Sequence, residues 1–428
     1  MKKAIIVGSG AGGATVAREL QGKFQVTVLE AGGAFRPFST SLNTIENARR
    51  TGLLFDEREI HWMFPNMVVR KSGEGMVLVN GIGEGGTTTI SAGNAIRCDH
   101  DLKAIGIDLD VEFEELYRDI PVSSDHRKKW HASTREVYEI CRAMDLQPQP
   151  TPKMVQLDRC AGCGKCVLGC SRGAKWDSRR FLNRAIENGA ALVSGCKVER
   201  VVIEKGRATG VFAGNHRRAR FHDADLVILA AGGLGTPLIL ERSGIACRPN
   251  LFVDPVLCVA TRWEGSLQNR EMPMPFIVQR DHYMISPYFD FLSFFFNRRW
   301  KHPGRDIFSL MIKLADNNAG SVSRQGARKS LSGIDRSRLQ DGVSLCTEIF
   351  RKLGKKPEEI FLGTVNAGHP GGMLPLTGKD RCTLHNDTLP FNMYVADASL
   401  LPQSPGNPAI LTIAALAKRI SKLCCQYA

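Results

Sequence analysis

Four cysteines stand close together in one short stretch of the sequence, CAGCGKCVLGC. They are separated by two, two and three residues, and they are Cys160, Cys163, Cys166 and Cys170. This spacing is that of a ferredoxin-type run that binds an iron–sulfur cluster, although the usual proline after the last cysteine is missing. We therefore predict a [4Fe-4S] cluster on these thiolates. Because the fourth cysteine of such a run can serve a different cluster, a [3Fe-4S] form without Cys170 is the alternative.

Two other interpretations of the cysteine run stay open. Four thiolates can bind zinc, but zinc sites commonly take their ligands from two pairs separated by a longer segment. The loop could instead be structural, with free thiols. The chain has 13 cysteines in all, and in the reducing cytoplasm we expect no disulfide framework, so the others should be buried or unreactive.

A second motif lies at the start of the sequence. Residues 4–7 are apolar and largely β-branched, and Gly8, Gly10 and Gly13 follow in the order G-x-G-x-x-G. The first glycine permits a tight turn, the second lets the backbone approach a pyrophosphate, and the third allows close packing of helix on strand. The next strand pattern, QVTVLE, ends in Glu30, which can accept hydrogen bonds from ribose hydroxyls and would repel a 2′-phosphate. This order predicts a dinucleotide site without deciding between FAD and NAD.

Two later segments are typical of a chain that returns to the same sheet. Residues 224–245, ADLVILAAGGLGTPLILERSGI, indicate a buried strand, a turn of small residues and a helix, and we place Gly232 of this turn at the cofactor. The preceding segment, ALVSGCKVERVVIEKG, indicates short strands that would set the backbone of Val198 against an adenine.

The segment PGNPAILTIAALAKRISKL predicts a helix near the end of the sequence. Asn407 suits the N-cap and Pro408 the first helical position, apolar residues recur at helical spacing, and basic residues follow in the later turns.

Together these motifs resemble the glucose-methanol-choline (GMC) flavoprotein oxidoreductases. The resemblance rests on the opening glycines with Glu30, on NGIGEGGTTTISAGNAIR at 80–97, and on YVADASLLPQSPGNPAILTIAALAKRI at 394–420. It implies FAD as the cofactor. It also implies that Gly83, Gly86 and Asn94 lie along the flavin. In the closing segment it sets Asp397 at the ribityl or phosphate side and brings Asn407 and Pro408 to the isoalloxazine ring.

The resemblance also implies the fold. We expect an α/β protein with a doubly wound, Rossmann-like FAD-binding domain and an α+β substrate domain built on an antiparallel sheet. The FAD-binding domain would comprise residues 1–100, 155–250 and 360–428, with the cysteine loop at 160–175. Residues 101–154 and 251–359 would form the substrate domain.

A catalytic pair follows from the same resemblance. The family carries a histidine where GHPGG places His369, and a second histidine or an asparagine where this sequence has Asn407. The combination of histidine and asparagine is similar to that of cholesterol oxidase and long-chain alcohol oxidase members. Oxidation of an alcohol requires removal of the hydroxyl proton, and an imidazole with a pKa near 6.5 suits this role. Asn407 would orient the hydroxyl or the developing oxyanion.

A cluster near the flavin would favour a dehydrogenase that passes electrons to an external acceptor. The predicted reaction is oxidation of a hydrophobic primary or secondary alcohol. The acceptor would be an acidic redox protein, a cytochrome or a quinone. Plant-type alcohol oxidases of the family carry a similar cysteine stretch, whereas some bacterial members hold an iron–sulfur cluster at a related site. The alternatives are therefore an oxygen-using alcohol oxidase without a cluster, an electron-transfer subunit of a larger complex, and an NAD-linked reductase.

Charge and apolar patterning bear on partners and location. The net charge is +14, from 57 basic and 43 acidic side chains, which would speed encounter with an acidic partner. No recognition motif for nucleic acid accompanies this charge.

The first residues lead directly into a strand pattern, so we expect no signal peptide and a cytoplasmic location. An aromatic segment at 288–300 with adjacent basic residues suits either a core and pocket wall or peripheral contact with the inner face of the membrane. The chain is short for the family, so another subunit could complete the pocket.

Overall fold

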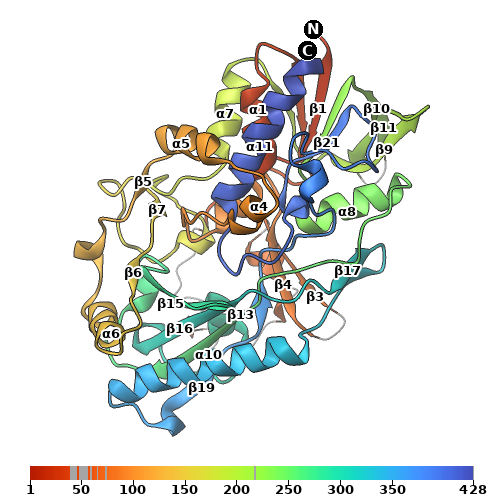
Figure 1. Cartoon of the computed structure of the whole chain (residues 1–428). Coiled ribbons are helices and arrows are strands. Elements are labelled where there is room, and N and C mark those ends of the chain that lie inside the picture. The colour runs from red at the N-terminus through yellow and green to blue at the C-terminus, as the bar shows by residue number, and fades with distance from the viewer. Residues whose placement is uncertain are drawn as a thin grey trace.

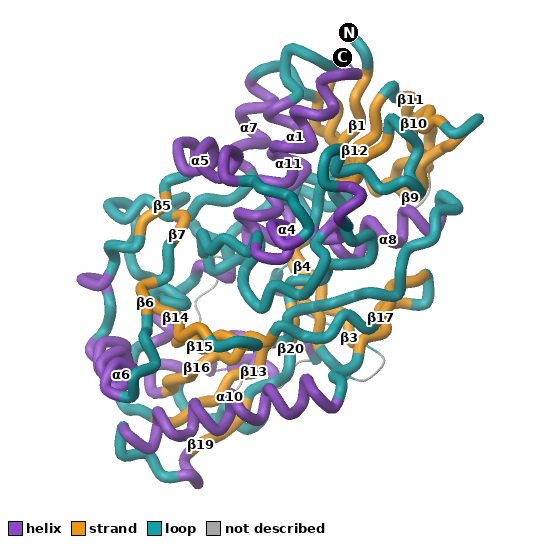
Figure 2. The backbone as a smooth tube through the Cα atoms, in the orientation of Figure 1, coloured by secondary structure: helices purple, strands orange, loops and turns teal. Residues whose placement is uncertain are grey.

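The computed structural model describes residues 1–38, 46, 47, 56, 57, 60–64, 66–72, 75–215 and 218–427. Two large sheets dominate the architecture (Figure 1). The sheet that contains β1 lies at the end of the molecule where both termini are found, and the sheet that contains β13 and β16 lies towards the opposite end. The tube view in Figure 2 shows long loops running between these two parts.

The first sheet has five parallel strands in the order β21-β12-β1-β2-β8. Apolar, mostly β-branched residues form these strands, and all four residues of β12 are buried, as expected for a parallel sheet covered on both faces. The strands are β1 (Lys3–Val7), β2 (Gln25–Leu29), β8 (Ala191–Val193), β12 (Leu226–Leu229) and β21 (Met393–Val395).

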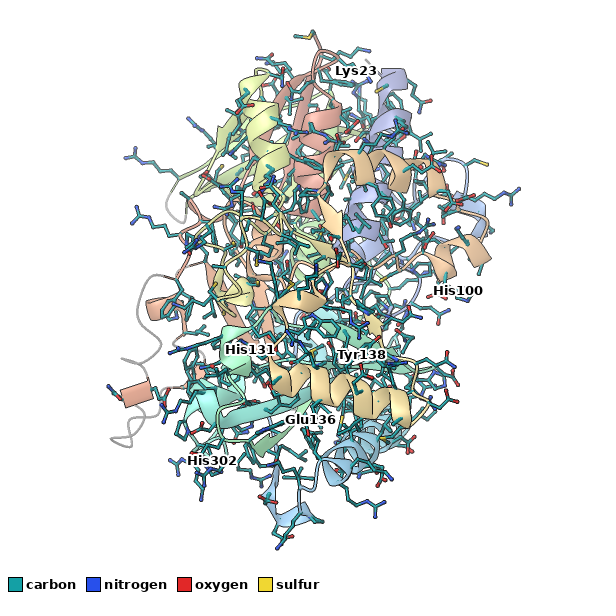
Figure 3. All side chains as sticks on the ribbon, turned by 90° about the vertical axis from the view of Figure 1, so that its left-hand side faces the viewer. Lys23, His100, His131, Glu136, Tyr138 and His302 are labelled. Atoms are coloured by element: carbon teal, nitrogen blue, oxygen red, sulfur yellow. The ribbon has the colours of Figure 1, made fainter. Side chains whose placement is uncertain are left out.

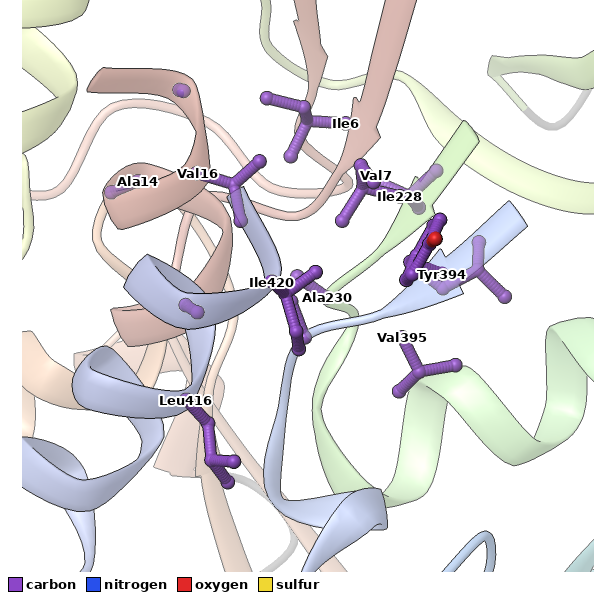
Figure 4. Packing of buried hydrophobic residues seen from close by; sticks show 14 of the residues in the cluster. Ile6, Val7, Ala14, Val16, Ile228, Ala230, Tyr394, Val395, Leu416 and Ile420 are labelled. Carbon is purple, nitrogen blue, oxygen red and sulfur yellow. The ribbon is translucent and has the colours of Figure 1, made fainter. Parts of the chain in front are cut away.

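Helices cover the parallel sheet and bury its apolar faces. Helix α1 packs against both α11 and α7, and α11 also contacts α5. Figure 4 shows Val16 of α1 and Ile420 of α11 close to Val7 and Ile228 of the strands. The helices around this sheet are α1 (Ala11–Glu19), α4 (His100–Ala104), α5 (Asp110–Asp119), α7 (Arg179–Glu187), α8 (Gly232–Arg242) and α11 (Ile410–Cys424).

The second sheet has nine strands and is mainly antiparallel. Its main order is β3-β4-β20-β13-β16-β15-β14-β6, and β19 pairs with β13. The strands are β3 (Met67–Lys71), β4 (Val77–Gly81), β6 (Gln149–Pro150), β13 (Val256–Arg262), β14 (Phe276–Gln279), β15 (Tyr283–Pro287), β16 (Ile307–Leu314), β19 (Ile360–Leu362) and β20 (Asn366–Ala367).

Helix α10 (Gly333–Lys352) lies across the outer face of this sheet (Figure 1). Ser332 caps the helix by accepting a hydrogen bond from the backbone N–H of Asp335, whose carboxylate in turn accepts one from the backbone N–H of Ser332. Side chains of α10 and of α6 (Ala132–Ala143) share a core cluster with strands β13 to β16. The remaining helices near the sheet are α3 (Ile60–Met63) and α9 (Phe291–Phe296).

Small elements complete the described part of the chain. Three antiparallel strands flank the parallel sheet, and two pairs of short strands lie elsewhere. These are β9 (Lys197–Glu204), β10 (Arg207–Asn215) and β11 (Arg218–Asp223), then β5 (Val122–Ser123) with β7 (Lys153–Met154), and β17 (Gly320–Ser323) with β18 (Gly326–Lys329). Short 3₁₀ turns span Gly86–Ile90, Arg127–Lys129, Cys166–Leu168, Gln268–Arg270, Gly304–Asp306, Pro357–Glu359, Gly378–Asp380, Ala398–Leu400 and Cys425–Tyr427.

The expected fold class is confirmed, because a parallel Rossmann-like sheet is combined with an antiparallel sheet. The predicted division into domains stays a prediction. Apolar residues between 102 and 120 belong to the core cluster of the parallel sheet, and β3 and β4 belong to the second sheet.

The predicted start of the last helix is wrong by a few residues. Helix α11 begins at Ile410 with Ala409 as its N-cap, so Asn407 does not cap the helix and Pro408 is not its first residue. The reason is that the Asn407 amide points elsewhere. Its Nδ2 donates to Gln279 Oε1 at 3.2 Å and to the carbonyl oxygen of Pro405 at 3.4 Å. No helix in the described ranges is long and apolar enough to cross a membrane.

Candidate active site

The opening glycines have the geometry that a dinucleotide-binding turn requires. Gly8 has φ +96°, in the left-handed region that favours glycine. A Cβ on Gly13 would lie 1.9 Å from the carbonyl oxygen of Gly8, so helix and strand can pack this closely only through glycine. A Cβ on Gly10, in contrast, would meet no atom within 4 Å. Gly10 therefore borders open space at the N-terminus of α1, where a pyrophosphate would bind.

Glu30 holds three backbone segments together. Its carboxylate accepts hydrogen bonds from the backbone N–H of Ser9 at 2.9 Å, of Gly32 at 3.0 Å and of Gly83 at 3.2 Å. Its side chain is buried, and this burial raises the pKa of the carboxyl group. The backbone of Glu30 also accepts a hydrogen bond from the N–H of Cys196 at 2.8 Å, which brings the start of β9 and Val198 close to the first glycine turn.

The second glycine-rich loop faces the first. A Cβ on Gly86 would lie 3.1 Å from the Cα of Gly10, and both Gly83 and Gly86 have positive φ. Asn94, further along this loop, accepts a hydrogen bond from Lys153 and has its Nδ2 2.9 Å from Met274 Sδ. Gly10 and Gly86 thus border one region, whereas Asn94 contacts Lys153 and Met274.

Asp397 joins the closing segment to the turn before α8. It accepts hydrogen bonds from the backbone N–H of Gly232 at 2.9 Å, from Thr236 Oγ1 at 2.5 Å and from the backbone N–H of Ser399 at 2.9 Å. Asp397 and Gly232, both predicted at the cofactor, are therefore in direct contact. A ligand role for each stays a prediction.

His369 lies on the wall of an apolar cavity of about 170 Å³. The cavity also contains Asn94 and Pro408, so three residues predicted from distant parts of the sequence border one space. Most of the other lining side chains are apolar. They include Phe64, Met67, Val79, Ile90, Leu168, Val256, Met274, Phe291, Phe295 and Met311.

The loop that carries His369 is fixed on both sides. It follows β20, and Gly371 exchanges two backbone hydrogen bonds of 3.1 Å with Phe252. Gly372 N–H donates to the carbonyl oxygen of Ala398 at 3.0 Å. A Cβ on Gly233 would lie 1.9 Å from the carbonyl oxygen of Pro370, so the loop sits directly on the start of α8.

A buried ion pair lies behind His369. Its Nδ1 is 3.8 Å from Asp254 Oδ2, which is too long for a hydrogen bond, and this Nδ1 is buried with no hydrogen-bond partner. Asp254 Oδ2 pairs with Lys313 Nζ at 2.5 Å. Burial, and then the positive charge of Lys313, lower the pKa of the His369 imidazole. The imidazole is therefore neutral at neutral pH and able to accept a proton.

Asn407 is close to the same network. Asp254 Oδ1 accepts a hydrogen bond from the N–H of the preceding residue, Gly406, at 3.2 Å. Asn407 Oδ1 is buried without a hydrogen-bond partner. Asn407 does not itself line the cavity, although Pro408 does. Two unsatisfied polar atoms, on His369 and Asn407, thus remain in the region where a flavin and an alcohol would have to bind.

Other histidines are placed elsewhere. Figure 3 labels His100, His131 and His302, which lie apart from one another, and none of the three lines the cavity.

The aromatic segment forms core and pocket wall. Phe289, Phe291, Phe294, Phe295, Phe296 and Trp300 are all buried. Tyr288, Phe291 and Phe295 line the cavity with His369. These side chains therefore offer no apolar surface to a membrane, and the predicted peripheral contact gains no support from them.

The four cysteines of the run line a second, smaller cavity of about 30 Å³. Gly162, Gly164 and Gly169 of this loop have φ of 60°, 74° and 94°. None of the chain's 13 cysteines, all of which lie in the described ranges, forms a disulfide. Cys382 is exposed, so for this cysteine only the second part of the expectation, that it is unreactive, stays a prediction.

The structure does not assemble the cysteines as ligands of a single ion. Among the described residues, no group of three or more His, Cys, Asp or Glu side chains is placed to hold a metal ion. The predicted metal role of the run stays a prediction, supported by the shared cavity alone.

Two lysines border the cysteine cavity. Lys153 and Lys175 both line it and both are buried. Burial lowers the pKa of Lys153 to about 7, and charged thiolates at Cys166 and Cys160 would act in the opposite direction. Burial also lowers the pKa of Lys175.

Sequence reasoning missed these lysines and the pair behind His369. Lys313 had a usable signal, because it is the one charged side chain in the apolar run IFSLMIKL. Lys175 had a weaker signal, because it follows closely after the cysteine run, in SRGAK. Asp254 and Lys153 lie in ordinary sequence, and no local pattern marks either of them.

The chain is similar to several known proteins. A sequence model described as GMC oxidoreductase matches residues 3–258. An uncharacterized protein of Methanocaldococcus jannaschii, MJ1450, is 25% identical over 419 residues, which is 97% of each chain. Long-chain-alcohol oxidase FAO4B of Arabidopsis thaliana is 29% identical over 286 residues, which is 59% of this chain but only 36% of the plant protein.

A solved structure shows the same fold over almost the whole chain. Pyridoxine 4-oxidase from Mesorbium loti superposes with a TM-score of 0.72 at 16% identity, covering 99% of both chains. The match to the family model covers more than half of the sequence, and the fold agrees with it. The chain belongs to the GMC oxidoreductase family.

Proposed function

We propose that the protein is an FAD-dependent enzyme that oxidises the CH–OH group of a hydrophobic alcohol. The observation that carries this proposal is His369, whose unpartnered imidazole, with a lowered pKa, lies on the wall of a largely apolar cavity. Membership of the GMC family and the similarity to a long-chain-alcohol oxidase support the reaction class.

The residues present fit FAD. The open space beside Gly10, the facing loop around Gly86 and the start of α1 form a cradle that a Cβ would fill. Gly8, Gly10 and Gly13 would hold the pyrophosphate. Glu30 and the backbone of Val198 would lie at the adenosine, and Gly232 and Asp397 at the ribityl and phosphate side. Gly83, Gly86, Asn94, Asn407 and Pro408 would border the ring. When bound, FAD supplies the acceptor for the hydride that leaves the carbinol carbon.

The side chains of the cavity would prepare the alcohol for this loss. His369 accepts the hydroxyl proton, and its lowered pKa keeps it free to do so at neutral pH. The Asn407 Nδ2 donates to Gln279 and Pro405, so the amide would have to turn before it could orient the oxygen on which negative charge develops. The apolar wall binds a hydrocarbon chain and excludes water, which strengthens both polar interactions.

We further propose that the enzyme is a dehydrogenase with an iron–sulfur cluster on Cys160, Cys163, Cys166 and Cys170. The shared cavity and the ferredoxin-type spacing support this assignment. At about 30 Å³ the cavity has room for little more than a water molecule, so the glycine-containing loop would have to spread around a cluster. These four cysteines would hold the cluster, which would supply one-electron transfer to an external acceptor such as an acidic redox protein, a cytochrome or a quinone.

An oxygen-using oxidase is the second candidate. The relative FAO4B and the structural neighbour pyridoxine 4-oxidase are both oxidases by name. Anaerobic purification followed by a visible spectrum and an iron assay separates the two candidates. A dehydrogenase with a complete cluster should contain flavin and about four irons per chain, whereas an oxidase of this kind would contain flavin alone and consume oxygen with the alcohol.

The role of His369 is tested by His369→Gln. We expect the rate at which a long-chain alcohol bleaches the bound flavin under anaerobic conditions to fall by about 10²–10⁴-fold, the usual contribution of a general base. His302→Gln is the matched control, because His302 packs on Phe361 and does not line the cavity. Unchanged bleaching in His369→Gln would show that His369 is not the base, whereas no bleaching in the wild-type protein would favour an electron-transfer subunit without substrate chemistry.

A further inference from the structure

Two buried lysines of the cysteine cavity lack the partner that the other buried lysines have. Five lysines are buried in the described part of the chain, and three of them form ion pairs with carboxylates. Lys313 pairs with Asp254 at 2.5 Å, Lys329 with Asp316 at 2.7 Å, and Lys418 with Glu19 at 3.0 Å and Glu115 at 3.1 Å. Lys153 and Lys175 are the other two.

The hydrogen bonds of Lys153 and Lys175 go to neutral oxygens. Lys153 Nζ donates to the side-chain oxygen of Asn94 and, at 2.6 Å, to the carbonyl oxygen of Pro273. Lys175 Nζ donates to the carbonyl oxygens of Thr88 at 3.0 Å, Thr89 at 2.8 Å and Ser91 at 2.9 Å.

No carboxylate of the described residues lies within ion-pair distance of either ammonium group. Asp177, which raises the pKa of Lys175 from further away, is itself paired with Arg179 at 2.8 Å. Lys153 is 1% exposed and Lys175 3% exposed, so bulk solvent does not screen either ammonium group.

An isolated buried charge is costly, and proteins retain one only with a compensating charge nearby. The acidic groups that share the cavity with both lysines are the four thiols of the cysteine run. Two ammonium groups beside four thiols would favour thiolates and any anionic group bound to them, and such an anion would in turn oppose loss of the lysine protons. Four thiolates around zinc and four thiolates around an iron–sulfur cluster are both anionic overall, so the choice of the cluster rests on the ferredoxin-type spacing of the cysteines.

We propose that Lys153 and Lys175 are the counter-charges of an anionic iron–sulfur cluster held by the cysteine run, and that they set its reduction potential. This inference rests on the cluster of the proposed function. The same two ammonium groups bind residues 88–94 of the second glycine-rich loop, so they also connect the cluster site to the loop that borders the flavin site.

The test is the midpoint potential of the cluster in the holoenzyme, followed by electron paramagnetic resonance during a redox titration. Reduction adds negative charge, so a nearby cation favours the reduced form. Lys153→Met and Lys175→Met should each lower the ratio of reduced to oxidised cluster at a fixed potential by tenfold or more, which corresponds to about 59 mV for a one-electron couple. Lys129→Met is the matched control, because Lys129 is exposed and donates to the carbonyl oxygen of Cys160 at 3.0 Å.

Each outcome decides between the inference and the proposed function. If the cluster is present and its potentials in Lys153→Met and Lys175→Met equal that in Lys129→Met, the inference about the lysines is overturned. The proposed iron–sulfur cluster then stands. If the wild-type protein binds no iron and sulfide on reconstitution, both the inference about the lysines and the proposed cluster are overturned. Bleaching of the flavin by alcohol still tests the oxidation chemistry separately. If a methionine variant does not fold, Lys153→Gln and Lys175→Gln keep a donor for the same oxygens and remove only the charge, so they should show the same shift.

Discussion

His369 is a polar, titratable side chain in a mostly apolar cavity. Its imidazole lines a cavity of mostly hydrocarbon side chains, and the charges nearest to it belong to the Asp254–Lys313 pair. Burial and the positive charge of Lys313 both make the imidazolium form less favourable. The consequence is a base that stays unprotonated in slightly acidic solution.

This electrostatic setting predicts the pH dependence of the reaction. A lowered pKa means that His369 loses its proton at a lower pH than the ordinary value of about 6.5. Since the base must be neutral to act, kcat/KM should stay constant as the pH falls to about 6.5 and decline only below it. A pH profile of kcat/KM with a slowly reacting alcohol measures this limb. A limb centred at or above pH 6.5 would contradict the assignment.

The Asp254–Lys313 pair should matter for stability. Both side chains are fully buried, and Lys313→Met would leave the Asp254 carboxylate without its partner. We expect the free energy of unfolding in guanidinium chloride to fall by about 3–5 kcal/mol. The double variant Asp254→Asn, Lys313→Met should regain part of this loss, because it removes the unpaired charge.

An exposed pair provides the comparison. Lys3 and Asp223 also form an ion pair of 2.8 Å, but their side chains are 49% and 65% exposed. Lys3→Met should leave the unfolding midpoint almost unchanged. Equal losses in Lys3→Met and Lys313→Met would show that burial does not determine the effect.

At the scale of elements, two glycines of the turn between β1 and α1 meet different requirements. Gly13 allows the helix to approach the strand, whereas Gly10 leaves space outside the protein core. Gly13 serves folding, and Gly10 is the glycine that we propose serves the ligand.

Two alanine variants distinguish these roles. Gly13→Ala puts a Cβ 1.9 Å from a backbone oxygen, so α1 must move and the melting temperature should fall, in line with the roughly 1–3 kcal/mol cost of overpacking. Gly10→Ala should keep its melting temperature without flavin and lose most of its flavin content, measured by absorbance. Gly333→Ala at the start of α10 is the control, because its Cβ also meets no atom within 4 Å. Normal flavin content in Gly10→Ala would place the cofactor elsewhere.

Local patterns in the sequence predicted the elements whose signals are local. The strand β1, the glycine turn, β2 and the closing helix follow from apolar periodicity and turn residues, although α11 begins later than expected because the Asn407 amide binds Gln279. The pair Asp254–Lys313 could not be predicted in this way. Its members are 59 residues apart, and their contact depends on how strand β16 is placed in a nine-stranded sheet.

At the scale of the whole molecule, the surplus of positive charge favours an acidic electron acceptor. The net charge of +14 would attract such a partner over distances limited by salt, since screening reduces the interaction beyond about 8 Å at physiological ionic strength. The rate of reduction of an acidic ferredoxin-type protein should therefore decrease steeply between low and physiological salt. A neutral quinone is the control and should react at a rate that hardly depends on salt. Parallel salt dependence for both acceptors would argue against steering by charge.

The fixation of the His369 loop has a consequence for diversification. The loop is held by Phe252, Ala398 and the start of α8, whereas much of the hydrocarbon wall comes from residues 288–295 and from the strands near them. Mutational libraries confined to that aromatic stretch should therefore change which molecules fit the cavity while His369, the proposed proton acceptor, keeps its place. Natural variants of this scaffold can therefore differ in substrate while they keep the same reaction.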